Sequence, residues 1–92
     1  MHYVYILANH SNEVIYIGVT NDLRRQLREH REGRIEGFTK KYHVKKLLYY
    51  ESYSSPIDAV SRERQLKKWT REKKNNLIAL KNPNWDDWSE AF

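Results

Sequence analysis

The chain has 92 residues, no cysteine and a formal net charge of +5, with a pI of about 9.5. This length allows one domain with a modest core, and the lack of cysteine excludes disulfides and thiolate metal sites. We expect a single domain over residues 1–92 in a cytoplasmic protein with no membrane association. No signal peptide is evident, and the apolar run at residues 3–8 is too short to span a bilayer.

The first two predicted elements are strands that form a hairpin. Alternating aromatic and β-branched residues favour strands over residues 3–8 and 14–20. Residues 10–12, His-Ser-Asn, are typical of the turn between them.

The hairpin register predicts a site for two tyrosines. Pairing Leu7 with Tyr16 places Tyr5 opposite Gly18, so Tyr5 and Tyr16 become diagonal neighbours on one face. Gly18 leaves open space beside these two phenols, into which backbone or a ligand can approach. Because tyrosine is common in strands, the alternative is that both rings only fill strand positions.

A helix follows the hairpin, capped by Asn21 or Asp22 and ended by Gly33. One face carries the residues at helical spacing: Leu23, Gln26, Leu27 and His30. A histidine on such a face is more often a satisfied core residue than a catalyst, and in either role it can bond a tyrosine hydroxyl.

The second half begins with a basic loop over residues 34–42, in which Phe38 and Tyr42 could stack on unpaired bases. Phe38 could equally anchor the loop to the core. A third strand is predicted over residues 44–53, apolar at its centre.

Two further helices complete the chain. Ser55 caps a helix that starts at Pro56 and ends near Trp69. Thr70 caps the next, which extends through residue 80 before Asn-Pro-Asn ends it. Trp85 and Trp88 are expected to fold back onto the core. The element order predicts an α+β domain with a small three-stranded, mainly antiparallel sheet flanked by helices.

Charge is concentrated in two segments. Residues 24–46 carry nine Lys or Arg and three Glu, and residues 62–74 carry seven Lys or Arg and two Glu. Two basic segments on one small domain suit a polyanion such as nucleic acid, although solubility alone is an equal alternative. The predicted phosphate contacts are Arg24, Arg25, Arg28, Lys40, Lys41, Lys67 and Lys68.

Glu63 is the unusual acidic residue of the chain. It is spaced three or four residues from Ala59, Val60 and Leu66, so it lies on the inward face of its helix. A carboxylate there needs a cationic partner, because desolvation is costly. A structural ion pair and a metal ion, such as Mg²⁺ held with substrate phosphates, are both open.

Four segments, in order, resemble the GIY-YIG nuclease family. They are Tyr3-Val4-Tyr5-Ile6-Leu7, with Val-Tyr where the family has Ile-Tyr; Tyr16-Ile17-Gly18-Val19-Thr20; Arg62-Glu63-Arg64-Gln65-Leu66-Lys67-Lys68-Trp69; and Asn82-Pro83-Asn84-Trp85. The family's arginine and histidine, four residues apart on a helix, correspond to Gln26 and His30. The resemblance covers nearly the whole chain, with Gly18 and Thr20 as structural motif residues.

The resemblance implies hydrolysis of nucleic-acid phosphodiesters with one divalent metal, Mg²⁺ or Mn²⁺. It implies that Tyr5 and Tyr16 lie at the nucleophile, with Tyr5 taking the proton from water and His30 assisting. It also implies that Glu63 holds the metal. A free phenol, with a pKa of about 10, is a weak base at pH 7 unless a cation stabilises the phenolate.

Gln26 departs from the family pattern. Glutamine can donate a hydrogen bond but has no charge and no bidentate fork. An arginine aimed at a phosphoryl transition state can be worth about 10³–10⁵ in rate. Three explanations stay open: compensation by a neighbour such as Arg25, binding retained without cleavage, or a deliberately introduced substitution.

We therefore expect a metal-dependent DNA endonuclease, with Gln26 as a possible impairment. The alternatives are a non-catalytic DNA-binding module on a nuclease scaffold and a basic structural or RNA-associated protein. The expected partner is DNA, with single-stranded, branched and duplex forms all open, and the expected state is a monomer or weak homodimer.

Overall fold

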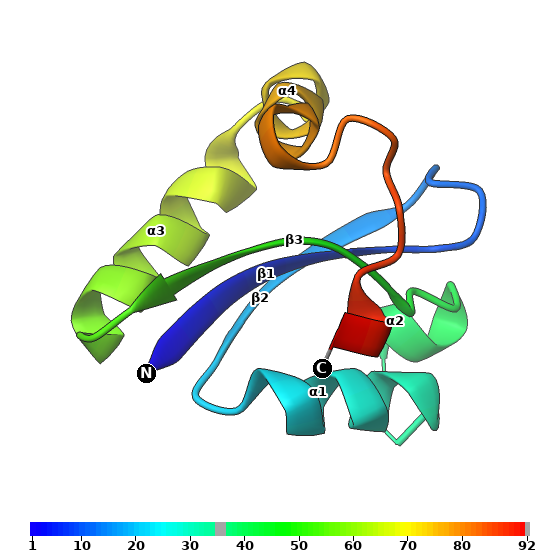
Figure 1. The fold of residues 1–92 in the computed structure, drawn as a ribbon, viewed down its shortest axis with the longest axis horizontal. Helices are drawn as coiled ribbons and strands as arrows, with labels where there is room; N and C mark the ends of the chain where they lie inside the picture. The colour runs from blue at the N-terminus through cyan, green and yellow to red at the C-terminus, as the bar shows by residue number, and fades with distance from the viewer. Residues whose placement is uncertain (35–36, 92) are drawn as a thin grey trace.

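A three-stranded sheet with helices on both faces organises the chain (Figure 1), in a computed structural model that describes residues 1–34 and 37–91. The strands are β1 (His2–Ala8), β2 (Ile15–Thr20) and β3 (Lys46–Tyr53). Their order is β2-β1-β3, and both neighbouring pairs are antiparallel. The predicted α+β class is confirmed, with the two N-terminal strands forming the expected hairpin.

The hairpin register matches the prediction. Tyr5 pairs with Gly18 and Leu7 pairs with Tyr16. On its other side β1 pairs with β3 through an irregularity: Ile6 pairs with Tyr49 while Leu7 pairs with Leu47, so Leu48 is an extra residue on β3. The extra residue lets the consecutive residues Leu48 and Tyr49 contribute to the same face of the sheet, while Leu47 faces the other.

The helices divide between the two faces of the sheet (Figure 1). On one face lie α1 (Leu23–Arg31), α2 (Phe38–Lys41) and the short 3₁₀ helix η1 (Ser89–Ala91). On the other lie α3 (Pro56–Lys68) and α4 (Arg71–Lys81).

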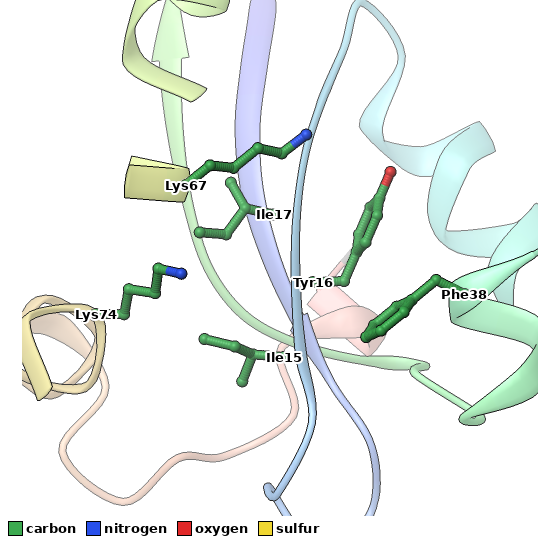
Figure 2. A pocket seen from close by; sticks show the side chains of 6 residues that line it. All are labelled: Ile15, Tyr16, Ile17, Phe38, Lys67 and Lys74. Carbon is green, nitrogen blue, oxygen red and sulfur yellow. The ribbon is translucent and has the colours of Figure 1, made fainter. Parts of the chain in front are cut away.

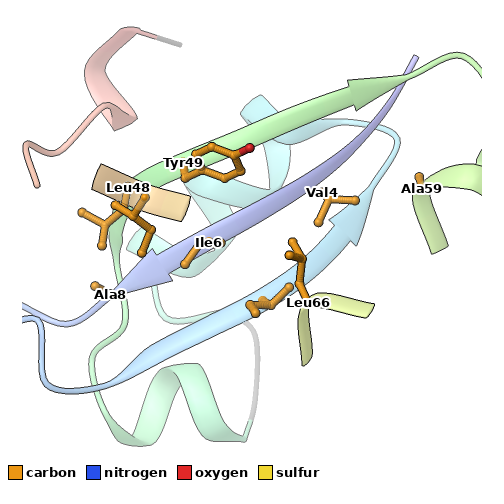
Figure 3. Close-up of a cluster of buried hydrophobic side chains, with 9 residues drawn as sticks. Val4, Ile6, Ala8, Leu48, Tyr49, Ala59 and Leu66 are labelled. Atoms are coloured by element: carbon orange, nitrogen blue, oxygen red, sulfur yellow. The ribbon is translucent and has the colours of Figure 1, made fainter. Parts of the chain in front are cut away.

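Hydrophobic residues of β1 alternate between two cores. Val4, Ile6 and Ala8 face α3 and α4 in one buried cluster, where Leu66 and Ile78 meet them (Figure 3). The alternate side chains of β1 point to the opposite face of the sheet, where they pack with α1 in a second buried cluster. This cluster consists of Tyr5, Leu7, Leu23, Leu27, Val44 and Leu47. Because both faces of β1 are buried, the hairpin register is strongly fixed.

The predicted helix caps are present. The Asp22 side chain accepts a hydrogen bond from the Arg25 N–H, the Ser55 hydroxyl from Asp58, and the Thr70 hydroxyl from Lys73, at 3.1, 3.4 and 3.2 Å. The three helices that these residues cap begin within one residue of their predicted starts.

The predicted loop over residues 34–42 needs correction, because residues 38–41 form the one-turn helix α2. The predicted start of the third strand at residue 44 is also early, since β3 begins at Lys46. The Val44 N–H donates to the Thr39 carbonyl at 2.9 Å and so closes the end of α2 instead of joining the sheet. Residues 35–36 of the predicted loop lie outside the described residues.

The C-terminal segment folds back on β3, as predicted from its tryptophans. Trp85 and Trp88 are half-buried, each against a different face of the sheet. The buried Asn82 amide donates to the Leu48 carbonyl at 3.0 Å, and the Trp88 N–H donates to the Leu47 carbonyl at 2.8 Å. These bonds attach the segment to β3 beside its extra residue.

An ion pair fixes the orientation of α3. Arg62 donates to both carboxylate oxygens of Glu51 on β3, at 2.9 and 3.0 Å, and the hydroxyls of Tyr49 and Tyr53 donate to the same carboxylate. Burial opposes ionisation of Glu51, but these hydrogen bonds outweigh it and hold its pKa below the ordinary value. Because Glu63 follows Arg62, about 100° further round the helix, this anchor also determines where Glu63 points.

Among the described residues, no helix combines the length and the apolar character that crossing a membrane requires.

Candidate active site

Two phenol rings pack over the backbone of β2 at Gly18. The ring centroids of Tyr5 and Tyr16 are 6.3 Å apart. A Cβ atom at position 18 would lie 2.6 Å from both Cζ and the hydroxyl oxygen of Tyr5, and 2.9 Å from Cε2 of Tyr16. The space predicted beside Gly18 is therefore filled by the two tyrosines themselves, and only glycine permits this packing.

His30 reaches the same place from α1. Its Nε2 lies 3.4 Å from the Tyr5 hydroxyl oxygen, and its Nδ1 lies 3.0 Å from the Thr39 hydroxyl oxygen on α2. Burial lowers the pKa of His30 below its ordinary value, and the carboxylate of Glu29 only partly opposes this. His30 is therefore a neutral imidazole at pH 7, held between a phenol and an alcohol.

Tyr5 is the buried member of the tyrosine pair. Its side chain is 3% exposed, and burial raises its pKa well above the ordinary phenol value, with Tyr16 and the carboxylates of Glu63 and Glu29 adding to the shift. Tyr5 is thus a neutral phenol at pH 7. Tyr16 is less buried and lines a cavity at the molecular surface.

Glu63 approaches from the opposite face of the sheet. Its side chain on α3 is 15% exposed, and its carboxylate lies 3.5 Å from the ammonium nitrogen of Lys67, one turn further along the helix. It is near enough for its charge to contribute to the pKa of Tyr5. The sequence predicts a cation beside Glu63, and in the structure this cation is the ammonium group of Lys67.

The two halves of the site meet at the outer edge of β2. Figure 2 shows Tyr16 on one side of the strand and Lys67 extending from α3 on the other. Since β2 is an edge strand, side chains from both faces of the sheet can converge around it. Tyr16 and Lys67 are among the side chains that line a cavity of about 220 Å³ at this edge.

The carboxylate of Glu63 fits a metal ion that is bound jointly by the protein and the substrate. Among the described residues, no group of three or more His, Asp or Glu side chains is placed to hold a metal ion. Glu63 is a single carboxylate donor. This donor set does not fit an all-protein cage, but it fits Mg²⁺ or Mn²⁺ bound through one carboxylate, water and substrate phosphate oxygens.

Gln26 lies half-buried on α1, one turn before His30, as its spacing predicts. Thr20, the other motif residue, is buried, and its hydroxyl accepts a hydrogen bond from the Asp22 N–H at 3.1 Å. Thr20 therefore shapes the turn that leads from β2 into α1.

The basic residues predicted to contact phosphates spread over three helices, and all are exposed: Arg24, Arg25 and Arg28 on α1, Lys40 and Lys41 on α2, and Lys67 and Lys68 on α3. Of these, Lys67 lines the cavity beside Tyr16. Arg24 and Arg28 line a separate hollow on α1. Arg25, the suggested substitute for a catalytic arginine, instead forms an ion pair with Glu29 at 3.9 Å.

Two residues of the site had no signal in the sequence. Thr39 holds His30 from a four-residue helix, and Lys74 lines the cavity from α4. Neither belongs to a motif, and only the packing of distant elements brings them to the site.

Comparison with known proteins finds relatives along most of the chain. The model of the GIY-YIG catalytic domain matches residues 1–76, a span that contains Tyr5, Tyr16, His30 and Glu63. A UPF0213 protein of Haloquadratum walsbyi is 40% identical over 76 residues, covering 83% of this chain and 84% of that protein. A UPF0213 protein of Clostridium perfringens is 38% identical over 92 residues, covering 100% and 98%.

A solved structure is similar as well. The solution NMR structure of the UPF0213 protein BH0048 from Bacillus halodurans has a TM-score of 0.60 and 29% sequence identity, covering 94% of this chain and 90% of that one. The names of these relatives specify no reaction and no ligand.

Replacing Gly18 tests the packing of the two phenols. We expect Gly18→Ala to lower the free energy of unfolding by about 1–3 kcal/mol, because the new methyl group must displace the rings of Tyr5 and Tyr16. Thermal unfolding measures the change, and NMR shifts of the Tyr5 ring report the displacement. The backbone of Gly18 is outside the left-handed region, so an unobstructed site would instead gain about 0.4–1 kcal/mol. Such a gain would contradict the packing.

Proposed function

This chain belongs to the GIY-YIG family, within the group of small UPF0213 proteins, and on that premise we propose that it is a metal-dependent endonuclease that hydrolyses DNA phosphodiester bonds. The observation that carries the proposal is the convergence at the edge of β2. Tyr5, Tyr16 and His30 arrive there from one face of the sheet and Glu63 from the other. Phosphodiester hydrolysis uses a base, a group that accepts the proton from that base, and a carboxylate.

His30 and Tyr5 act as a proton relay in this proposal. A buried phenol with a raised pKa is a poor source of free phenolate. With the imidazole proton on Nδ1 and donated to Thr39, Nε2 can accept the Tyr5 hydroxyl proton as the Tyr5 oxygen takes a proton from the attacking water. The concerted transfer avoids a free phenolate, and the lowered pKa of His30 keeps Nε2 available at pH 7.

Tyr16 orients the nucleophile beside this relay. It lines the cavity while Tyr5 is buried behind it, so Tyr16 is the phenol that meets water and phosphate first. Its hydroxyl can position the attacking water for transfer to Tyr5.

Glu63 is the residue that would hold Mg²⁺ or Mn²⁺. When bound, the metal would neutralise charge on the scissile phosphate and on the leaving oxygen. In the protein alone, Lys67 balances the charge of Glu63 at 3.5 Å. Lys67 can turn outward to a phosphate, since half of its side chain is exposed. The carboxylate then becomes available.

DNA is the proposed partner because exposed basic residues lie in the cavity and on helices of both faces of the sheet. Lys67 is in the cavity itself, with Lys68 next to it on α3. Arginines of α1 and lysines of α2 extend the basic surface from the other face of the sheet. Such residues bind phosphates without regard to sequence, which suits a domain of this size.

Gln26 favours a second candidate, a DNA-binding module without turnover. It supplies no guanidinium to the phosphate, and Arg25 is engaged with Glu29 on the exposed side of α1. The two candidates differ in one measurable property, metal-dependent cleavage.

Removing the Glu63 charge tests the metal assignment. We expect Glu63→Gln to reduce Mg²⁺- or Mn²⁺-dependent cleavage of labelled single- and double-stranded DNA by at least about 10²-fold, because the proposed carboxylate ligand is lost. Binding in EDTA should change little. Glu72→Gln, the same charge change at an exposed position of α4, is the matched control. Cleavage that persists in Glu63→Gln, or falls equally in both variants, would show that Glu63 holds no catalytic metal.

Restoring an arginine separates the enzyme from the binding module. We expect Gln26→Arg to raise the cleavage rate by roughly 10²–10³, since a guanidinium would stabilise the charge that develops on the phosphate. Asn76→Arg adds the same charge at an exposed position of α4 and should leave the rate unchanged. If neither this protein nor Gln26→Arg cuts with any metal, the binding module is the correct function.

The protonation of His30 gives a pH test. Because burial lowers its pKa, His30 should lose its proton below the ordinary value of 6.5. Cleavage should therefore hold from pH 8 down to about 6.5 and fall only as more acid protonates Nε2. An NMR titration of the His30 ring locates the midpoint directly. Glu29→Gln should lower it further, because that carboxylate favours the imidazolium. A midpoint at or above 6.5 would refute the neutral relay.

A further inference from the structure

A row of aromatic rings extends from the candidate active site to the surface. The ring of Phe38 stacks on Tyr16, with centroids 6.3 Å apart and planes 29° apart. Tyr42 follows, with its centroid 4.9 Å from that of Phe38. Phe38 is 47% exposed and Tyr42 is 41% exposed, at the two ends of α2. Nearly half of Phe38 therefore faces solvent, in a basic part of the molecule.

The cavity at the edge of β2 combines this aromatic wall with two cations. Phe38 and Tyr16 line it from one side of β2, and Ile15 and Ile17 form its apolar part on the other side of the strand (Figure 2). Lys67 and Lys74 line the other side, from α3 and α4 respectively. We name this cavity, lined by these six residues, the β2-edge pocket.

The chemistry of the β2-edge pocket matches one nucleotide. A planar base can stack on an aromatic face whatever its identity, and stacking on protein rings is a principal source of affinity for single strands. Two ammonium groups opposite the rings suit the phosphate attached to that base. A paired base offers no free face, because its neighbours in the duplex already stack on it.

We propose that the β2-edge pocket binds an unpaired nucleotide next to the phosphate to be cleaved, with its base on Phe38 and its phosphate between Lys67 and Lys74. Its position next to the scissile phosphate rests on the proposed nuclease function, but binding of the base does not depend on cleavage. The substrate class that follows is DNA with unpaired nucleotides, as in single strands, flaps and gaps.

Base stacking can be measured without any cleavage. The probe is a single-stranded oligonucleotide carrying one 2-aminopurine, bound to the full chain in EDTA, and its blunt duplex with the complementary strand is the comparison. We expect the single strand to bind more tightly, with quenching of the 2-aminopurine. Phe38→Leu should abolish the quenching and weaken single-strand binding by roughly 5- to 100-fold, with little effect on the duplex.

Two controls separate stacking from general damage. Phe38→Trp keeps an aromatic face and should retain the quenching. Ile57→Ala removes an exposed apolar side chain of α3 that is outside the pocket and should change nothing. Tyr42→Leu is a second test of the row of rings should Phe38→Leu lower the melting temperature.

The phosphate contacts are tested by the dependence of affinity on salt. Each lysine that neutralises a phosphate contributes about 0.7 to the slope of log K against log salt for a single strand. Lys67→Gln and Lys74→Gln should each lower the slope by about that amount. Lys81→Gln is the matched control, because Lys81 is also on α4 but lies 5.6 Å from the ring centroid of Tyr49, on β3.

The outcomes distinguish this inference from the nuclease proposal. Equal affinity for single strand and duplex, quenching that survives Phe38→Leu, or an equal loss of slope in Lys81→Gln would each overturn the pocket. Conversely, the protein could show stacking that depends on Phe38 and yet cut no DNA. That result would support the nucleotide site and refute the nuclease proposal.

Discussion

The rings of Tyr5 and Tyr16 occupy the space that a side chain at position 18 would fill. Because Tyr5 lies directly across the hairpin from Gly18, the register of β1 and β2 decides whether both phenols reach the same point. A shift of one residue would send one ring to the opposite core. The buried faces of β1 prevent that shift, so the packing of the two hydrophobic cores also fixes the geometry of the candidate site.

Burial then sets the chemistry of that site. It keeps both Tyr5 and His30 neutral, by raising the pKa of one and lowering that of the other, and so prepares a donor and an acceptor 3.4 Å apart. The carboxylate of Glu63 comes from the other face of the sheet. It can arrive there because β2 is an edge strand and because Arg62, bound to Glu51, holds α3 in one orientation. A cavity lies beside the same edge strand, lined by side chains from both faces.

Local rules account for much of the fold and part of the site. The period of two along a strand, together with the turn, predicts the pairing of Tyr5 with Gly18. Side-chain oxygens at Asp22, Ser55 and Thr70 mark the starts of the helices, because each satisfies a backbone N–H that would otherwise lack a partner. Helical spacing places His30 on the buried face of α1. The order of these segments is enough to identify the family.

The sequence by itself therefore determined the strands and main helices, the hairpin register, the candidate phenols and the family resemblance, since each depends on neighbours along the chain. Only the tertiary structure decided that Thr39 binds His30 and that Lys74 joins Phe38 at the β2-edge pocket. Residues 38–41 also form a short helix in the structure. The Val44 N–H donates to the Thr39 carbonyl at the end of this helix. The contacts of Thr39 and Lys74 join elements whose closeness depends on how the sheet and its helices pack, and no local pattern encodes that distance.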